Sequence, residues 1–566
     1  MSKQDAGETK MINTVKKDKI MFLLLSLVIA AGVYLRAAGL PHSFEYDEIW
    51  TLRHYLSLPF SAVFTELETP NNHPLHTLFL QWSMTFFHDG VADVKYPAFV
   101  FGLATLFAGV WFTWKFTKRK SSVLLTASIL SFHAYLIYYS HTARGYSLQT
   151  FFVLLTAVSL FQIARQKQLK WYVPVFLLSG ICSCLSITSG LIFVCALCGS
   201  FLITLLFGTN NREDRKKIFL TFLPPAAGFV LFALLWYGAN YSRIAAGQSF
   251  GSNVLNPLDF LKFCWDVSYG LLLIPLLLIH LAGIFFLSGQ RRRFAAANLI
   301  FAGLVFLSAT VTKAGPVRVY LPMVPVLTFG ASLVLTALCR SWKRELLFPA
   351  AAFLSICYLG CCSHMLNKVV PPDWFLLSDE IIKEIPANIY VNYSSHDSFT
   401  AVHSHTAVKE DFIKRLSTVQ MQGFLQTNSK GTVDFYSIKQ QSPVSFQFPD
   451  PVVKQFTSQE GVRMDLYELE PLTEGSITKD QPVFLTVLPV RISQYQAFYP
   501  LLLQLGGEWH LSNLFLNHKR YAEDGEEIKA AAMFNPSANQ EASVYLKLTE
   551  YSKGLFRFYT FRKTVR

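Results

Sequence analysis

The stretch IMFLLLSLVIAAGVYLRAAGL, residues 20–40, is the first long apolar run of the chain, and Phe44-Glu45-Tyr46-Asp47-Glu48-Ile49-Trp50 follows it closely. About twenty consecutive apolar residues are enough to cross the hydrocarbon core of a bilayer as a helix. Adjacent carboxylates just past such a run are costly near lipid unless they lie in a wet, polar cavity, where they are usually functional. The pair Asp47 and Glu48 therefore predicts an active site at the membrane surface, with Asp47 at its centre.

Composition indicates that most of the chain belongs in the membrane. The 566 residues include 50 phenylalanines, 52% of the side chains are hydrophobic, and the mean hydropathy is +0.33. Such values are too apolar for a soluble globular protein and indicate a polytopic membrane protein. The formal net charge of +13 would suggest a nucleic-acid partner in a soluble protein. Because the excess basic residues lie in short loops between apolar runs, the positive-inside rule explains them better, and no nucleic-acid partner is expected.

Apolar windows of roughly twenty residues predict about eleven transmembrane helices. Lys16, Lys17 and Lys19 precede the first, as in the n-region of a signal peptide, but the length of the run and the lack of a small-residue cleavage site favour a retained anchor. The predicted spans lie near residues 20–39, 95–116, 121–140, 147–164, 171–187, 189–208, 218–238, 267–289, 296–312, 318–339 and 346–366.

Lysine and arginine residues occupy every second loop, together with the lysine-rich N-terminus. Positively charged loops stay on the cytoplasmic side, so the alternate loops, which include the Asp47 stretch, are expected to face outward. No organellar address is apparent, and a bacterial cytoplasmic (inner) membrane is therefore the expected location. The basic loops contain Lys118-Arg119-Lys120, Arg165, Lys167, Lys170, Arg212, Arg215, Lys216, Lys217, Arg291-Arg292-Arg293, Arg340, Lys343 and Arg344.

The first outward loop, residues 41–94, is long enough to carry structure of its own. Its segments Ile49–Leu58 and Pro74–Phe87 have the pattern of short amphipathic helices with aromatic anchors, which lie in the membrane interface. Pro70 and Pro74 disfavour helix between them and predict a tight turn at Asn71-Asn72-His73.

The character of the chain changes after Leu366, where polarity becomes mixed. Short runs of period-two alternation predict strands, and two segments, Asp379–Ile385 and Tyr495–Leu505, are predicted as helices. An odd number of spans from an inside N-terminus places this part outside. The expected fold class is a polytopic α-helical membrane protein, with a transmembrane catalytic domain over residues 1–366 and a soluble extracytoplasmic α+β domain over residues 367–566. The predicted strands are Asn388–Tyr393, Thr432–Ile438, Val462–Leu469, Phe484–Ile492 and Ser543–Leu548.

Polar residues collect at the predicted outer ends of the spans. A transfer from a phosphorylated lipid requires that a hydroxyl is deprotonated and that a phosphate is bound. The two carboxylates can accept the proton, and the basic side chains that face them can bind the phosphate. Arginine binds phosphate through two parallel hydrogen bonds, so Arg144 and Arg318 are the better phosphate ligands. The candidate catalytic residues are Asp47 and Glu48, and the candidate substrate-binding residues are Asn72, His73, Lys95, His141, Arg144, Tyr146, Arg318 and Tyr320.

Several of these residues also have a structural interpretation. A lysine such as Lys95 at the mouth of a helix most often extends its ammonium to the membrane interface. His73, directly before Pro74, can simply satisfy a backbone group of its loop. The aromatic residues around the site are typical of the belt that anchors membrane proteins at the interface; they are Tyr46, Trp50, Tyr138 and Tyr139.

Several motifs, taken in order, resemble the glycosyltransferase C superfamily, and most closely its protein O-mannosyltransferase-like and lipid A aminoarabinose transferase-like branches. The resemblance covers roughly residues 20–340. The motifs are the pair Asp47-Glu48 after the first span, His73-Pro74-Leu75, Lys95-Tyr96-Pro97-Ala98, Tyr138-Tyr139-Ser140-His141-Thr142-Ala143-Arg144-Gly145-Tyr146-Ser147, and Arg318-Val319-Tyr320-Leu321-Pro322-Met323-Val324-Pro325.

The resemblance implies an enzyme that takes a hexosyl or pentosyl group from a polyprenyl-phosphate carrier, such as undecaprenyl phosphate. The sugar passes to a hydroxyl of a glycan, lipid or protein acceptor on the outer face, with inversion at the anomeric carbon. By the same resemblance, Asp47 is the base that activates the acceptor. Lys95, Arg144, Arg318 and the loop residues near His73 are then expected to bind the lipid phosphate.

The chain departs from the family pattern at two positions. Aminoarabinose transferases carry an acidic-basic pair in the first loop where this chain has Asn72-His73, so the resemblance does not extend to the same sugar or acceptor. The usual arginine at the start of the second span is Lys95 here, and a lysine ammonium is a less exact phosphate ligand. Nothing in the sequence demands a metal ion or another cofactor, although Glu48 with His73 or His141 offers ligands for a divalent ion.

Two other function classes compete with a transferase. A transporter or flippase for lipid-linked glycans should carry ionisable residues deep within several spans, whereas the predicted span centres are nearly free of them. Alternatively, the C-terminal domain is the working part and the helices only anchor it, for which one span would suffice.

Overall fold

The computed structural model describes residues 3–369, apart from 43, 57, 68–70, 87–90, 209–211, 248–251 and 342–345, and beyond them thirteen strands between Gly423 and Lys563. The chain forms two compact units, one of Met1–His42 with His54–Pro371 and the other of Ser43–Arg53 with Pro372–Arg566. The predicted division into functional domains at residue 366 stays a prediction.

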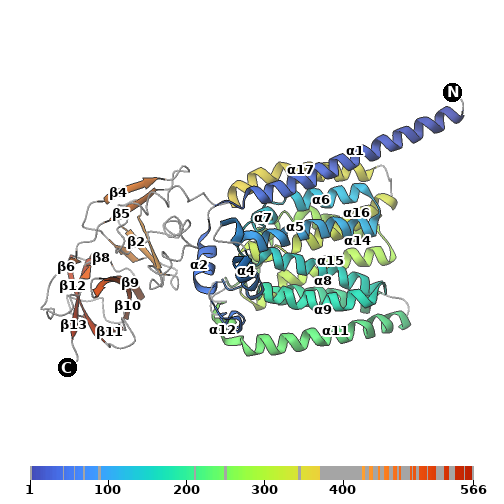
Figure 1. Ribbon diagram of the computed structural model, residues 1–566. Helices are drawn as coiled ribbons and strands as arrows, with labels where there is room; N and C mark the ends of the chain where they lie inside the picture. Colours follow the sequence, from blue (N-terminus) through green and yellow to red (C-terminus); the bar gives the residue numbers. More distant parts are fainter. Residues whose placement is uncertain are drawn as a thin grey trace. The chain divides into compact units, whose positions relative to one another are not determined.

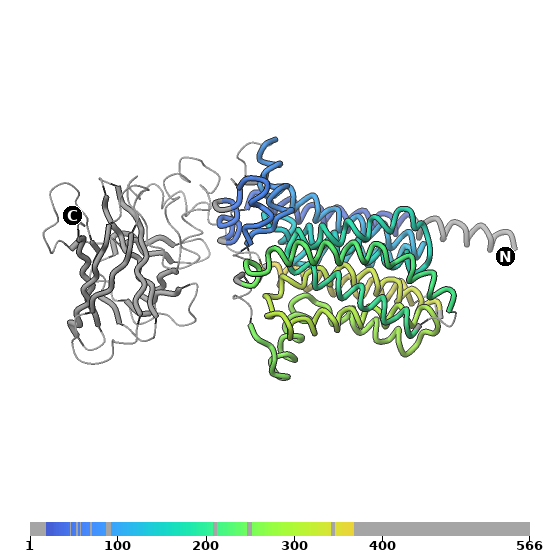
Figure 2. The backbone as a smooth tube through the Cα atoms, turned by 90° about the horizontal axis from the view of Figure 1, so that it is seen from below, coloured from blue at the N-terminus to red at the C-terminus, as the bar shows by residue number. Residues whose placement is uncertain are grey.

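The first unit is a bundle of long helices that run side by side (Figure 1 and Figure 2). Among the described residues, nine helices are long and apolar enough to cross a membrane, which makes the chain an integral multi-pass membrane protein. The helices of this unit are α1 (Lys3–Ala38), α3 (Phe60–Val63), α4 (Pro74–Phe86), α5 (Val91–Thr117), α6 (Lys120–Phe132), α7 (Ala134–Tyr138), α8 (Tyr146–Ala164), α9 (Leu169–Ser186), α10 (Gly190–Gly208), α11 (Arg212–Ala239), α12 (Tyr241–Gly247), α13 (Pro257–Gly270), α14 (Ile274–Phe286), α15 (Gly289–Val311), η2 (Val317–Tyr320), α16 (Met323–Ser341) and α17 (Leu347–Val369).

Two of the predicted spans are broken. The segment predicted near residues 121–140 is α6 followed by α7, with His133 extended between them at φ −76° and ψ 115°. The segment predicted near residues 267–289 is the end of α13 followed by α14, and these two helices meet at an angle of 104°. An apolar window detects both segments but not their interruptions, because hydropathy carries no information on backbone direction.

One hydrogen bond joins the two breaks, and another connects the second break to α17. The ring of His133 accepts from the N–H of Leu136 through Nδ1 at 3.4 Å, so Nε2 carries the proton and donates to the carbonyl of Leu271 at 3.0 Å. The hydroxyl of Tyr358 donates to the carbonyl of Leu272 at 2.7 Å. Backbone groups released from a helix at membrane depth need such partners, because lipid offers none.

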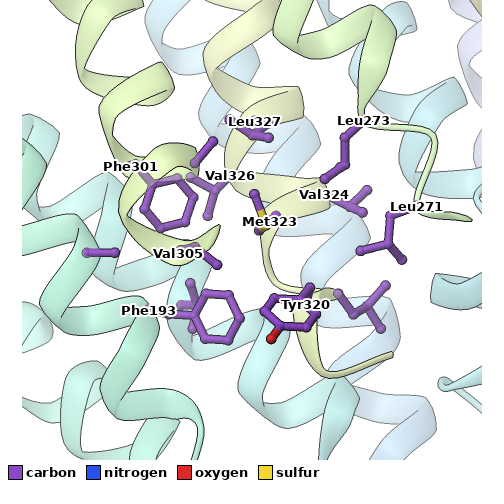
Figure 3. Packing of buried hydrophobic residues seen from close by; sticks show 14 of the residues in the cluster. Phe193, Leu271, Leu273, Phe301, Val305, Tyr320, Met323, Val324, Val326 and Leu327 are labelled. Carbon is purple, nitrogen blue, oxygen red and sulfur yellow. The ribbon is translucent and has the colours of Figure 1, made fainter. Parts of the chain in front are cut away.

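Part of the apolar core of the bundle surrounds the start of α16 (Figure 3). Residues from this helix end meet side chains of α10, α15 and the α13–α14 bend, so segments far apart in the sequence fix the position of η2. Spans are also joined by hydroxyl pairs, such as Thr126 with Ser332 at 2.8 Å. The labelled members of the core are Phe193, Leu271, Leu273, Phe301, Val305, Tyr320, Met323, Val324, Val326 and Leu327.

The predictions for the first outward loop are confirmed as helices. Ile49–Leu58 corresponds to α2 (Tyr46–Tyr55) and Pro74–Phe87 to α4, while the short helix α3 between them was not predicted. Asn71-Asn72-His73 forms the expected turn before α4.

In the second unit, the described residues beyond Pro372 are strands. A seven-stranded sheet has the order β1-β2-β3-β8-β13-β12-β11, and β9 pairs with β10, β4 with β5 and β6 with β7, all antiparallel. The strands are β1 (Gly423–Thr427), β2 (Val433–Ser437), β3 (Val444–Phe446), β4 (Val452–Thr457), β5 (Arg463–Tyr467), β6 (Pro471–Leu472), β7 (Leu485–Thr486), β8 (Pro489–Arg491), β9 (Gln496–Leu505), β10 (Glu508–Asn517), β11 (Ile528–Phe534), β12 (Ala542–Ser552) and β13 (Leu555–Lys563).

The strands predicted at Thr432–Ile438, Val462–Leu469, Phe484–Ile492 and Ser543–Leu548 are confirmed as β2, β5, β7 with β8, and β12. The helix predicted over Tyr495–Leu505 is wrong, because this segment is the strand β9 and pairs with β10 along its whole length. Pro500 lacks the N–H that a helix interior needs, and a continuous apolar run does not distinguish strand from helix. The predictions for Asp379–Ile385 and Asn388–Tyr393 lie outside the described residues.

Candidate functional site

The motif of residues 138–147 forms the turn between α7 and α8, and the structure explains its composition directly. Residues 138–147 are all buried. The hydroxyl of Thr142 donates to the carbonyl of Tyr138 at 2.8 Å, and that of Ser147 donates to the carbonyl of Tyr139 at 2.6 Å. These side chains satisfy carbonyls at the end of α7, which is why a stretch rich in Ser and Thr forms a compact turn here.

His73 joins this turn to the loop before α4. Its Nδ1 accepts a hydrogen bond from the N–H of Gly145 at 2.7 Å, and its ring lies edge-on to Tyr146 with the ring centres 5.6 Å apart. His73 therefore has a structural function that spans 72 residues of sequence. A β-carbon on Gly145 would lie 2.3 Å from the carbonyl oxygen of Ser186 and 2.9 Å from Nδ1 of His73, so only glycine fits.

Tyr146 contacts two arginines. The guanidinium carbon of Arg144 is 5.8 Å from the centre of the Tyr146 ring, within the range of a cation–π contact. Nε of Arg318 donates to the phenol oxygen of Tyr146 at 3.1 Å. The structure thus brings together three of the predicted residues from α8, the turn before it and η2, with Arg144 buried and Arg318 half-buried.

Tyr320 is the last residue of the same short helix η2. Its ring is 2% exposed and contacts Phe263 of α13 edge-on, with ring centres 5.2 Å apart. Burial raises the pKa of the Tyr320 phenol to about 12, so the group stays protonated near neutral pH. Its contacts make Tyr320 an anchor of η2, and a part in substrate binding stays a prediction.

Lys95 and His141 form a second polar region. The ammonium of Lys95 donates to the carbonyl of His42 at 2.7 Å, and Lys95 is 1% exposed, so it does not reach out to the interface as a snorkelling lysine does. Burial lowers the pKa of His141 to about 3, and Lys95, His42 and Arg36 act in the same direction. His141 is therefore a neutral imidazole at physiological pH.

His76 was not predicted from the sequence. It lies one helical turn after His73 on α4 and is completely buried. Burial lowers the pKa of His76 to about 3, with the positive charge of Arg144 acting in the same direction. The pattern His73-x-x-His76 at the start of a helix is the sequence feature that would have pointed to it, because residues three apart share a helix face.

Asn72 uses its amide within its own loop. Nδ2 donates to the carbonyls of Val63 at 2.9 Å and Glu66 at 2.7 Å, and Oδ1 accepts from the hydroxyl of Thr77 at 3.1 Å. These contacts connect the end of α3 to the start of α4. Asn72 therefore shapes the loop, and a contact with substrate stays a prediction.

The carboxylate pair lies in the first turn of α2, within the second unit. Oε2 of Glu48 accepts from the N–H of Glu45 at 2.9 Å, the reciprocal contact of a capping box, and Glu48 is 1% exposed. Asp47 is half-buried, and its carbonyl accepts from the hydroxyl of Thr51 at 2.9 Å. Glu48 thus has a structural reason to be acidic, and Asp47 is the better candidate for chemistry.

Within the part of the chain that the structure describes, no group of three or more His, Cys, Asp or Glu side chains is placed to hold a metal ion.

No protein-family model and no curated protein matches the chain. Among solved structures, the chain is similar to ArnT from Cupriavidus metallidurans, in the apo state and bound to undecaprenyl phosphate. Each comparison has 13% sequence identity and a TM-score of 0.39, and covers 69% of this chain and 76% of that one.

Proposed function

We propose that the protein is a membrane glycosyltransferase that moves a sugar from a polyprenyl-phosphate carrier to an acceptor hydroxyl. The observation that supports this most directly is the placement of Arg144 and Arg318 against Tyr146. Two guanidinium groups held by one aromatic side chain suit an oxygen-rich anion such as a phosphate diester.

The reaction is a single displacement at the anomeric carbon. The acceptor oxygen forms the new bond to this carbon while the bond to the phosphate oxygen breaks, and the lipid phosphate leaves with the electron pair. Asp47 takes the proton of the acceptor hydroxyl, and the arginines, with Lys95, stabilise the charge that develops on the leaving phosphate. Such a displacement inverts the anomeric centre.

The proposed setting is the outer face of a bacterial cytoplasmic membrane. A polyprenyl chain is apolar and stays in the bilayer, while a glycan or protein acceptor arrives from water, so the reacting atoms must meet near the interface. The strands beyond Pro372 are proposed to recognise the acceptor.

The experiment is sugar release from a panel of radiolabelled polyprenyl-phosphate sugars by the purified protein, with a membrane extract as acceptor source. Wild type is compared with Asp47→Asn and Arg318→Gln. Turnover of a donor by wild type and its loss in both variants would support the proposal. Full turnover by Asp47→Asn would remove Asp47 as the base, and donor binding without any release by wild type would favour a transporter of lipid-linked glycans.

A further inference from the structure

We propose that Arg36, in the first span, is a positioning residue that holds the turn carrying Arg144 and Tyr146. This inference rests on the proposed function for its kinetic test. Arg36 lies in the last turn of α1, within the span Lys19–Ala38, and is 1% exposed. A buried arginine in a membrane span is costly, so it needs partners and a reason.

The partners of Arg36 are protein groups. Nη2 donates to the carbonyl of Leu130 at 2.7 Å, and Nη1 donates to those of Gly32 at 2.8 Å and Ser131 at 3.4 Å. Nε donates to the hydroxyl oxygen of Ser140 at 3.1 Å. A guanidinium has five N–H donors, so these four contacts use most of its capacity within the protein. Arg36 therefore acts through other residues and is not proposed to touch substrate.

The contacts follow from the break between α6 and α7. Because the chain becomes extended at His133, the last carbonyls of α6 have no intrahelical partners. Arg36 donates to two of them, at Leu130 and Ser131, and its positive charge also suits the negative end of the helix dipole. A lysine ammonium cannot reproduce this planar arrangement of donors.

From the break, the contacts continue into the candidate site. Ser140, which accepts from Arg36, also donates to the carbonyl of Leu136 at 2.5 Å and begins the turn that leads to Arg144. The ring of His141 lies against Gly39, just after α1, where a β-carbon would be only 2.3 Å from it. The end of α1 and the residue that follows it thus contact Ser140 and His141, near the start of the turn.

The test compares Arg36→Lys, Ser140→Ala and the double variant with wild type. The control is Arg340→Lys, which makes the same exchange at an exposed position at the end of α16. We expect kcat for the donor to fall about tenfold or more in Arg36→Lys, since misplaced transition-state contacts are lost, with a smaller change in KM. The two single effects should not add, because the variants remove one shared contact.

Hydrogen exchange provides a readout that does not depend on activity. In Arg36→Lys, amides of residues 139–146 should exchange at least about tenfold faster, while those of α15 and of the control protein stay unchanged. Unchanged exchange in this turn together with additive kinetic effects would overturn the role of Arg36 and leave the transferase intact. If wild type turned over no donor, the proposed function would fail, and the exchange data would still decide for or against Arg36.

Discussion

At the scale of a single residue, close contacts in the candidate site leave no space for a larger side chain. Gly145 is the sharpest case, because backbone from the end of α9 and the ring of His73 close on it from two directions. The sequence motif around Arg144 includes this glycine, but the residues that require it, Ser186 and His73, lie far away in the sequence. Spacing alone could not supply that reason.

Gly145→Ala should therefore lower the stability of the purified protein and its activity. The added methyl group would meet a carbonyl oxygen that belongs to another helix, and such overpacking costs about 1–3 kcal/mol. The measurement is the midpoint of thermal unfolding in detergent. The matched control is Gly238→Ala in α11, where a β-carbon meets nothing within 4 Å. Equal midpoints for the two variants would contradict the close contact at Gly145.

His76 should make the stability of the protein depend on pH below neutrality. Its pKa falls from 6.5 to about 3 on folding, so between these values the unfolded chain binds the extra proton. Stability is then fully present above about pH 6.5 and is lost as the pH falls toward 3, by up to ~1.4 kcal/mol per pH unit.

The variant His76→Gln removes this proton linkage. Its unfolding midpoint should fall less than that of wild type when the pH is lowered from 7 to 5. Parallel midpoints for the two proteins over this range would show that His76 is not buried as a neutral group.

Tyr146→Phe tests the contact that connects η2 to the turn. The variant keeps the ring over which Arg144 lies but loses the oxygen that accepts from Arg318. We expect kcat/KM for the donor to fall about tenfold, which corresponds to one charge-assisted hydrogen bond. The fall should shrink when Arg318→Gln is already present, and an undiminished fall would separate Tyr146 from Arg318.

At the scale of elements, hydropathy located every span of the bundle but missed both breaks. Runs such as residues 121–140 are apolar enough to be predicted as one helix, and only the extended backbone at His133 divides them. Arg36 was missed for a related reason, since one polar residue hardly changes a window average. The charged residues at span ends were found because their cost near lipid is visible in sequence.

Removing the hydrogen bond between the two breaks should cause a measurable loss of stability. His133→Leu leaves the carbonyl of Leu271 without its donor, and an unsatisfied buried group costs about 1–3 kcal/mol. The unfolding midpoint should fall clearly. Thr310→Ala, which removes only an exposed bond to Leu307 within α15, is the control and should behave like wild type.

At the scale of the whole molecule, the candidate site exists only because segments far apart in sequence converge. Sequence analysis named Asn72, His73, Lys95, Arg144 and Arg318 as one group, yet it could not say which of them touch. The structure gives Asn72 and Glu48 local structural contacts, and it brings both arginines into contact with Tyr146. The sugar and acceptor of the proposed transferase cannot be named from the spacing of motifs or from composition, because they depend on the detailed shape of the binding site.

The distance along the chain between Tyr146 and Arg318 also sets an order of events during biosynthesis. Ribosomes add about 5–20 residues per second, and 172 residues separate the two partners. A growing chain must therefore wait roughly ten to thirty seconds after Tyr146 is made before Arg318 can reach it. During that interval Arg144 and Tyr146 have already been synthesised in a bundle that lacks η2. A chain that stalls before residue 318 therefore lacks the contact between Arg318 and Tyr146, however many spans it has already inserted.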